Sequence, residues 1–260
     1  MLNLAEPALM LELTHLVSYL NTLLQASKIQ DYCPNGLQVQ GTATVQRLVA
    51  GVTASQQLLD AAIESDADAI LVHHGYFWKN EPLCITGIRQ QRLKKLLVND
   101  ISLLAYHLPL DLHPEYGNNV QLARQLAWPV EAAALVRGQP PLVRSAELGH
   151  AWTGDQMQQH LQVRLDREAM HIPADRPIKR IAWCTGAAQS SIGEAIALQA
   201  DAYLTGEVSE ATVHEARENN IHFFAAGHHA TERYGVKALS EHLAQKFDLD
   251  CQFIDCDNPA

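Results

Sequence analysis

The chain has 260 residues, 47% of them hydrophobic and 18% charged, which is the composition of a globular protein with a sizeable core. Its formal net charge of −10, with no long basic run, argues against nucleic acid as a partner. No segment approaches the roughly 18 uninterrupted apolar residues of a membrane span, and residues 2–16 lack the basic start of a signal peptide. We therefore expect a cytoplasmic protein without a membrane partner, whose five cysteines, which include no C-x-x-C pair, are reduced.

The first half of the chain alternates between helical and extended patterns. Apolar residues at helical spacing predict a helix over 11–26, and Ser55 is placed to cap a second helix over 56–65. Pro34, Asn35 and Gly36 predict a turn that leads into an extended stretch. Further helices are expected over 85–99 and 118–127, and strands over 47–53, 70–72 and 101–106.

The second half repeats this alternation. Residues 129–141, rich in small residues with prolines at both ends, are interpreted as a loop near a domain boundary, and 170–177 as a connection. Helices are expected over 155–163, 190–199, 209–219 and 231–247, and strands over 180–184, 202–205, 221–226 and 249–254. Strands that alternate with helices predict an α/β fold of layered sheets and helices, with mostly parallel strands.

The two halves also resemble each other in sequence. The segment L-V-A-G-V-T-A-S at 48–55 aligns with I-A-W-C-T-G-A-A at 181–188, an offset of 133 residues. At the same offset A-D-A-I-L-V-H-H at 67–74 aligns with A-D-A-Y-L-T-G-E at 200–207. The following strand aligns at an offset of 121, and Tyr-Gly comes shortly after it in both halves. Any two βαβ units look somewhat alike, but these matches together predict a pseudo-symmetric architecture.

Two adjacent histidines stand at the end of a predicted strand. His73 and His74 follow the apolar run 70–72, and the carboxyl edge of an open α/β sheet is where such sheets keep their sites. Neutral imidazole is a common ligand of transition metals, so this pair is a candidate metal site. The alternative is a structural pair, in which one histidine is satisfied in a turn and the other is exposed.

Each half also offers a histidine followed four residues later by a carboxylate. These pairs are His107 with Asp111 and His228 with Glu232, while Glu207 takes the place of His74 in the second half. Imidazole and carboxylate ligands without thiolate suit Zn, Fe, Mn or Ni. Because five or six ligands exceed the need of one tetrahedral zinc, we expect two adjacent divalent ions, an arrangement typical of hydrolases.

Some roles within this set remain open. We prefer His228 to His229 as a ligand because His107 is its counterpart in the other half. His107 is either a ligand or a general acid/base, and we favour the second role. Nucleotide-binding glycine loops and the serine-hydrolase elbow have no matching motif.

Five motifs resemble the GTP cyclohydrolase 1 type 2 family, also known as the Ngg-interacting-factor-3-like family. They are N-G-L-Q-V at 35–39, V-H-H-G-Y-F-W-K at 72–79, H-L-P-L-D at 107–111, T-G-E-V-S-E at 205–210 and G-H-H-A-T-E-R-Y-G at 227–235. The resemblance implies two interleaved α/β domains, which we place at 1–128 plus 227–260 and at 129–226. It also implies a toroidal homohexamer with a dinuclear metal centre facing the interior. The metal ligands of the family fall on His73, His74, Asp111, His228 and Glu232.

Three functions are compatible with this set of residues. The first is a metal-dependent hydrolase that acts on a nucleotide or similar small molecule, with a GTP cyclohydrolase-like ring opening in which His107 or Glu207 moves protons. The second is a metal-dependent phosphoesterase at the same site. The third is a non-enzymatic, metal-stabilised hexamer that serves as a scaffold or binding protein.

Overall fold

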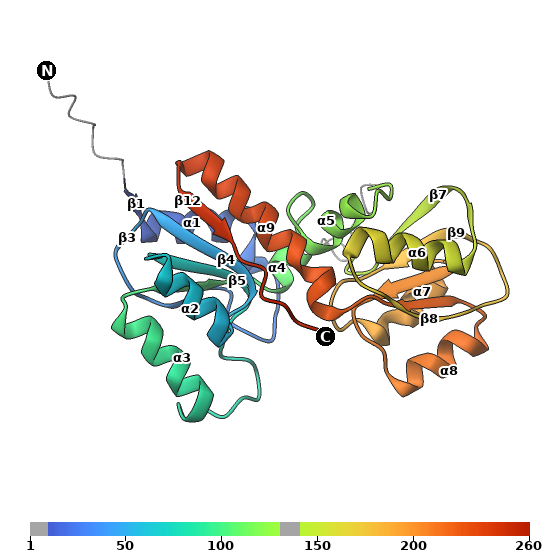
Figure 1. The fold of residues 1–260 in the computed structure, drawn as a ribbon, viewed down its shortest axis with the longest axis horizontal. Helices are drawn as coiled ribbons and strands as arrows, with labels where there is room; N and C mark the ends of the chain where they lie inside the picture. The colour runs from blue at the N-terminus through green and yellow to red at the C-terminus, as the bar shows by residue number, and fades with distance from the viewer. Residues whose placement is uncertain (1–9, 131–140) are drawn as a thin grey trace, which may run out of the picture. The chain divides into compact units, whose positions relative to one another are not determined.

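The computed structural model describes residues 10–130 and 141–260, which form two compact units. The first unit contains the described residues up to His107 together with Ser240–Ile254, and the second contains those of Leu108–Leu239 with Asp255–Ala260 (Figure 1). Each unit is therefore built from two separate segments of the chain. The predicted loop at 129–141 lies almost entirely outside the described residues.

The units differ from the predicted domains in where the chain crosses between them. We placed 108–128 and 227–239 in the first domain, whereas the structure assigns both segments to the second unit. The reason is packing, because Leu122, Leu126 and the half-buried Tyr234 belong to the apolar core around the second sheet.

In the described part of the first unit, five strands form a sheet in the order β12-β4-β5-β6-β2. The neighbours β12, β4, β5 and β6 run parallel, and β2 closes one edge in the antiparallel direction. The strands are β2 (Gly36–Val39), β4 (Arg47–Thr53), β5 (Ala69–His74), β6 (Ser102–Ala105) and β12 (Asp250–Phe253), with a separate antiparallel pair of β1 (Leu11–Glu12) and β3 (Thr44–Val45). The helices are α1 (Leu13–Leu23), α2 (Gln56–Glu64) and α3 (Gly87–Val98), and Ser55 caps α2 as predicted.

In the described part of the second unit, five strands form a sheet in the order β7-β9-β10-β11-β8. The central strands β9, β10 and β11 are parallel, and both edge strands are antiparallel. The strands are β7 (Arg144–Trp152), β8 (Met170–Ile172), β9 (Ile178–Trp183), β10 (Ala202–Thr205) and β11 (His222–Ala225). The helices are α4 (Leu108–Asp111), α5 (Asn118–Gln125), α6 (Gly154–Leu165), α7 (Ile192–Ala197) and α8 (Glu210–Glu218), and α9 (His228–Phe247) contributes residues to both units.

The second sheet is covered by helices on both faces. Because successive side chains of a strand point to opposite faces, Trp183 and Phe224 pack with residues of α5 and α6, whereas Phe223 and Tyr203 pack with residues of α7 and α8. The predicted α/β fold of layered sheets and helices is thus confirmed. Among the described residues, no helix is both long and apolar enough to cross a lipid bilayer.

The internal repeat is visible in the hydrogen bonds that start the central strands. Asp68 Oδ2 accepts hydrogen bonds from the backbone amides of residues 46 and 47, each at 2.8 Å. Asp201 Oδ2 accepts hydrogen bonds from the backbone amides of residues 179 and 180, each at 2.9 Å. All of these positions are related by the 133-residue offset of the sequence alignment. We call these two aspartates the strand clamps.

The strand pairing also shows where the match of His107 with His228 departs from the register of the two sheets. Val72 pairs with Ala105 in the first sheet, and Thr205 pairs with Ala225 in the second. On this register His107 would match Gly227, so the match with His228 requires one extra residue at the end of β11. The extra residue fits at Gly227, whose φ of +96° is a backbone conformation that residues with a side chain rarely adopt.

Removing either strand clamp should destabilise the fold by a similar amount. Asp68→Ala and Asp201→Ala each delete an anionic acceptor of two backbone hydrogen bonds, so we expect each to lower the free energy of unfolding by about 2 kcal/mol. Asp201 also pairs with Arg176, but that arginine side chain is 41% exposed, so the pair adds little. Glu64→Ala, which removes an exposed carboxylate at the end of α2, is the matched control and should change it by less than about 0.5 kcal/mol. Denaturant unfolding measures all three, and an unchanged midpoint in either clamp variant would contradict the assignment.

Candidate metal centre

Three histidines of the first unit lie together at the carboxyl edge of its sheet. His73 and His74 end β5, and His107 follows the neighbouring parallel strand β6. One ring nitrogen from each of the three lies within 4.8 Å of the others. The ring centroid of His73 is 4.5 Å from that of His74 and 5.0 Å from that of His107. The structure therefore brings together all the predicted site residues of this unit.

Backbone and side-chain partners orient two of these rings. His73 is fully buried, and its Nδ1 donates a hydrogen bond to the carbonyl of Tyr106 at 3.0 Å. That bond places the proton on Nδ1 and the lone pair on Nε2, which is the tautomer that a metal-ligating histidine needs. His74 Nδ1 lies 3.1 Å from the hydroxyl oxygen of Thr53.

The third ring is held by a carboxylate that sequence reasoning missed. Asp31 Oδ1 lies 2.8 Å from His107 Nδ1, and Asn35 holds both residues by accepting from the His107 amide and donating to Asp31 Oδ2. Burial raises the pKa of Asp31, but the hydrogen bonds and charge of its partners outweigh it and lower the pKa to about 2. Asp31 and His107 thus form a dyad in which the aspartate is ionised.

In the second unit, one histidine lies between two carboxylates. His228 Nε2 is 3.0 Å from Glu232 Oε2, and His228 Nδ1 is 2.7 Å from Glu207 Oε1. His228 begins α9, so Glu232 lies one helical turn further along the same face. His229, the competing residue, instead contacts Asp255 at 2.7 Å.

A second buried carboxylate lies close to Glu232. Oxygens of Asp111 and Glu232 are within 4.8 Å of each other, and Asn118 donates a hydrogen bond of 2.8 Å to Asp111. Both carboxylates also act on the buried thiol of Cys184. Burial raises the pKa of this thiol most, and the negative charges of Asp111 and Glu232 raise it further. The second unit therefore concentrates negative charge where four of the predicted residues lie: Asp111, Glu207, His228 and Glu232.

This negative charge favours the protonated form of His228. Burial lowers the pKa of His228, but its bonds to Glu232 and Glu207 and their charges outweigh burial and raise the pKa from 6.5 to about 9. In the metal-free protein, a proton therefore occupies the ring that a cation would bind.

Metal-free protein should lose stability as the pH rises from about 6.5 to about 9. In this window the folded state keeps the His228 proton and the unfolded state does not, so the stabilisation is complete below pH 6.5 and is lost as the pH passes the folded-state pKa. Chemical unfolding at several pH values measures the effect, and Glu232→Gln should flatten the curve. A slope of the same size in the Glu232→Gln variant would contradict this origin.

Gly186 offers no ligand atom, but its lack of a side chain leaves room for Glu232 and His228 of the second unit. Gly186 has φ +68°, and a Cβ at this position would overlap Glu232 Oε1 and lie 3.2 Å from His228 Nε2. Its counterpart at the 133-residue offset is Thr53, the partner of His74. In the sequence, only the alignment of the two halves draws attention to Gly186, because it places this glycine opposite Thr53.

The donor chemistry of both sets fits divalent metal ions. The first unit presents three imidazoles, and the second presents an imidazole with buried carboxylates, donors that suit Zn, Fe, Mn and Ni. The second set also has an excess of negative charge, which a cation would neutralise. In the first unit, Asp31, Cys33 and His107 form a further group with metal-ligand donors.

Comparison with known proteins identifies the family. The family model of Duf34/NIF3 (NGG1p interacting factor 3) matches residues 11–259. The chain belongs to the Duf34/NIF3 family. The match covers the motifs on which the resemblance was based, and the predicted family is therefore confirmed.

Curated relatives within this family match the chain over nearly its whole length. A Pseudomonas aeruginosa protein named GTP cyclohydrolase 1 type 2 homolog is 60% identical over 249 residues, which is 95% of this chain and 98% of the relative. An Escherichia coli K12 protein of the same name is 51% identical, covering 95% of this chain and 99% of the relative.

Solved structures show the same Duf34/NIF3 fold. A structure described as protein ybgI, of unknown function, superposes with a TM-score of 0.91 at 50% identity, covering 96% of this chain and all of that one. Protein TTHA1606 from Thermus thermophilus superposes with a TM-score of 0.83 at 31% identity, again covering 96% of this chain and all of that one.

Proposed function

We propose that this protein is a metal-dependent hydrolase that acts on a nucleotide or a related small molecule. Two observations carry the proposal: the three histidines of the first unit, whose ring nitrogens lie within 4.8 Å of one another, and His228 of the second unit, which lies between Glu207 and Glu232. These donors suit the same metals. The names of the relatives, which are homologues of GTP cyclohydrolase 1 type 2, support a ring-opening reaction on a purine nucleotide.

The proposed ligands are the five residues to which the family resemblance points. His73 and His74 would come from the first unit, and Asp111, His228 and Glu232 from the second. Together they would hold two divalent ions per chain. Such ions, when bound, lower the pKa of water and neutralise charge on the attacked group.

His107 and Glu207 would then have different tasks. Because Asp31 holds His107 at Nδ1, the dyad supports a role for His107 in moving a proton through Nε2, although Nε2 could equally serve as a ligand atom. Glu207 contacts Nδ1 of His228, a contact that supports a role in orienting this ligand.

Aromatic side chains beside His107 support a substrate with a planar ring. The Trp78 ring centroid is 4.9 Å from that of His107, and the Tyr32 ring is 5.8 Å away. Tyr32 is 57% exposed, so its ring is accessible for stacking on a ligand. Lys79, which is exposed and next to Trp78, offers a positive charge for a phosphate.

Metal reconstitution followed by a nucleotide panel tests the proposal. Protein loaded with Zn, Mn, Fe or Ni is incubated with GTP and other nucleotides, and formate, phosphate and ring-opened products are measured. We expect formate release from GTP, its loss in His228→Ala, and a reduction of at least about 100-fold in Asp31→Asn. His214→Ala, in an exposed residue of α8, is the control and should retain activity.

The other outcomes separate the rival functions. Phosphate release without formate would identify a phosphoesterase at the same site. If metal-loaded protein turned over no nucleotide, both enzymatic functions would be contradicted, and the metal-stabilised scaffold would be the function that remains. The homohexamer that the family resemblance implies is part of this proposal, and sedimentation measurements with and without metal test it.

A further inference from the structure

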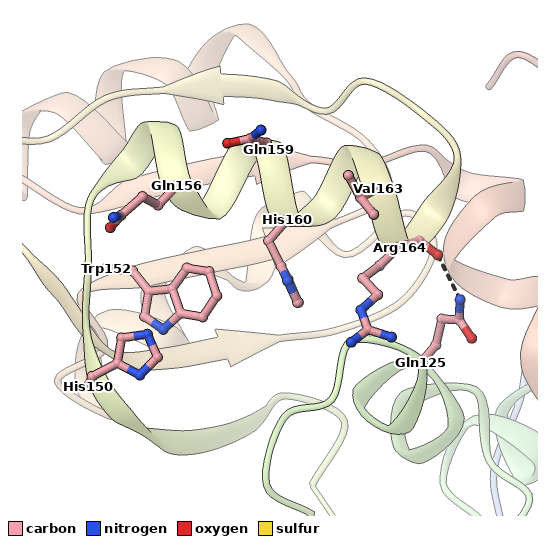
Figure 2. Close-up of a pocket in the computed structure, with 8 residues that line it drawn as sticks. All are labelled: Gln125, His150, Trp152, Gln156, Gln159, His160, Val163 and Arg164. Carbon is pink, nitrogen blue, oxygen red and sulfur yellow. Dashed lines mark hydrogen bonds between the residues drawn. The ribbon is translucent and has the colours of Figure 1, made fainter.

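A concave site lies on the surface of the second unit. Its volume is about 620 Å³, within the usual range for small-molecule sites. It is formed by the end of β7, one face of α6 and Gln125 of α5 (Figure 2). None of the proposed metal ligands lines it.

One wall of this site, which we call the β7–α6 pocket, is aromatic. The rings of His150 and Trp152 are stacked, with centroids 5.0 Å apart and an angle of 21° between the planes. His160 meets the same indole edge-on at 5.1 Å. His150 is exposed, so a face of the indole is covered only by a side chain that solvent can reach. This arrangement shows how a flat ring from a ligand would lie on Trp152.

Hydrogen bonds hold the walls of the pocket in place. His160 Nε2 donates to the carbonyl of Leu126 at 2.8 Å, and Gln125 Nε2 donates to the carbonyl of Arg164 at 2.7 Å. A capping box between Thr153 and Gln156 fixes the start of α6 immediately after Trp152. The pocket is thus formed before any ligand binds.

The charge of the pocket is opposite to that of the chain. Among the described residues that line it, Arg164 is a cation and none is a carboxylate, although the chain carries a net charge of −10. Figure 2 shows Trp152, His160 and Arg164 side by side along one side of α6. The exposed guanidinium of Arg164 and the ring of Trp152 line the same pocket, so both are open to one ligand that has a flat ring and an anionic group.

We propose that the β7–α6 pocket binds a planar heteroaromatic ring that carries an anionic group, the chemistry of a nucleoside monophosphate. The ring replaces the His150 imidazole on the indole, and the phosphate pairs with Arg164. Gln125 and Gln156 also line the pocket, and the amide atoms that their bonds to Arg164 and Thr153 do not use, Gln125 Oε1 and Gln156 Nε2, offer an acceptor and a donor there. This site is independent of the proposed metal centre and of its reaction.

Calorimetric titration of metal-free protein tests the proposal, with His228→Ala as the background so that the proposed metal centre does not contribute. The probes are AMP, adenosine, inorganic phosphate and a five-nucleotide single strand of adenylates. We expect AMP to bind more tightly than adenosine or phosphate alone. Tighter binding of the oligonucleotide than of AMP would overturn the assignment to a mononucleotide and indicate a single strand as the occupant.

Variants show whether the binding belongs to this pocket. Trp152→Ala should weaken AMP by about 10-fold or more, and Trp152→Phe should restore part of the loss. Because Trp152 also packs on the core, Arg164→Gln provides a test that removes no buried side chain. Arg164→Gln should weaken the binding of AMP about 5-fold and leave the binding of adenosine unchanged. Arg217→Gln, which removes an exposed arginine of α8, is the control and should change neither.

A further variant tests the stacking geometry. His150→Ala uncovers the indole face and should bind AMP at least as tightly as the unaltered protein. Absence of saturable AMP binding, or equal AMP binding in the Arg164→Gln and Arg217→Gln variants, would overturn the proposal.

Discussion

Glu232→Gln should abolish metal binding by the second unit. Glu232 is almost fully buried, lies 3.0 Å from His228 and is close to Asp111, so the substitution removes a proposed ligand and half of the buried negative charge that favours a cation. We expect the affinity of this set to fall by at least about 100-fold, since loss of a partner that merely orients a ligand already costs about 10–100-fold. Titration with zinc, with the metal content measured after dialysis, should show fewer ions per chain.

The chain contains a matched control for this substitution. Glu210 and His214 on α8 form a pair with the same four-residue spacing but in the reverse order, at 3.1 Å, and their side chains are 89% and 60% exposed. Glu210→Gln therefore removes a carboxylate from a histidine–glutamate pair of the same spacing without removing a buried charge, and it should leave the metal content unchanged. Equal metal content in the two variants would contradict the assignment of Glu232 as a ligand.

Gly186→Ala should disrupt the same set without altering any ligand. The added Cβ would overlap the carboxylate of Glu232, and the backbone at φ +68° is strained for alanine. We expect a loss of about 2 kcal/mol in the free energy of unfolding and a loss of metal affinity similar to that of Glu232→Gln. Chemical unfolding and metal titration measure the two effects.

The control for this variant is another glycine of the second unit. Gly193 lies in α7, is exposed, and a Cβ there would meet no atom within 4 Å. Gly193→Ala should leave metal binding intact and raise stability by up to about 1 kcal/mol, because alanine favours the helix. Normal metal binding by Gly186→Ala would show that Glu232 can move away without loss of function.

The central parallel strands were predictable because their apolar runs are uniform and each is followed by a helix. The edge strands β7 and β8 of the second sheet were not predicted. β7 has no regular alternation of buried and exposed positions, and β8, which lies within the predicted connection at 170–177, is only three residues long. The last helix begins at residue 228 instead of 231, because Gly227-His-His reads as a turn in the sequence.

The same contrast holds for the site. His73, His74 and His107 could be placed together because parallel neighbouring strands end at one edge of a sheet. Asp31 could not, because it reaches His107 from 76 residues away and lies before the turn at 34–36, with no motif of its own. Gly186 was missed because its role is steric. It matters because it has no side chain, and a single sequence does not show which glycines leave room for a neighbouring group.

The strand clamps Asp68 and Asp201 have a consequence for how such a protein can evolve. Each aspartate secures the sheet at the amino end of its central strand, whereas the histidines, Gly206 and Glu207 lie at the opposite end. Mutations at the far tips therefore leave the scaffold's anchoring intact. The two halves can therefore differ at these strand ends, with His73-His74 in one and Gly206-Glu207 in the other, while the aspartates that secure their strands stay the same.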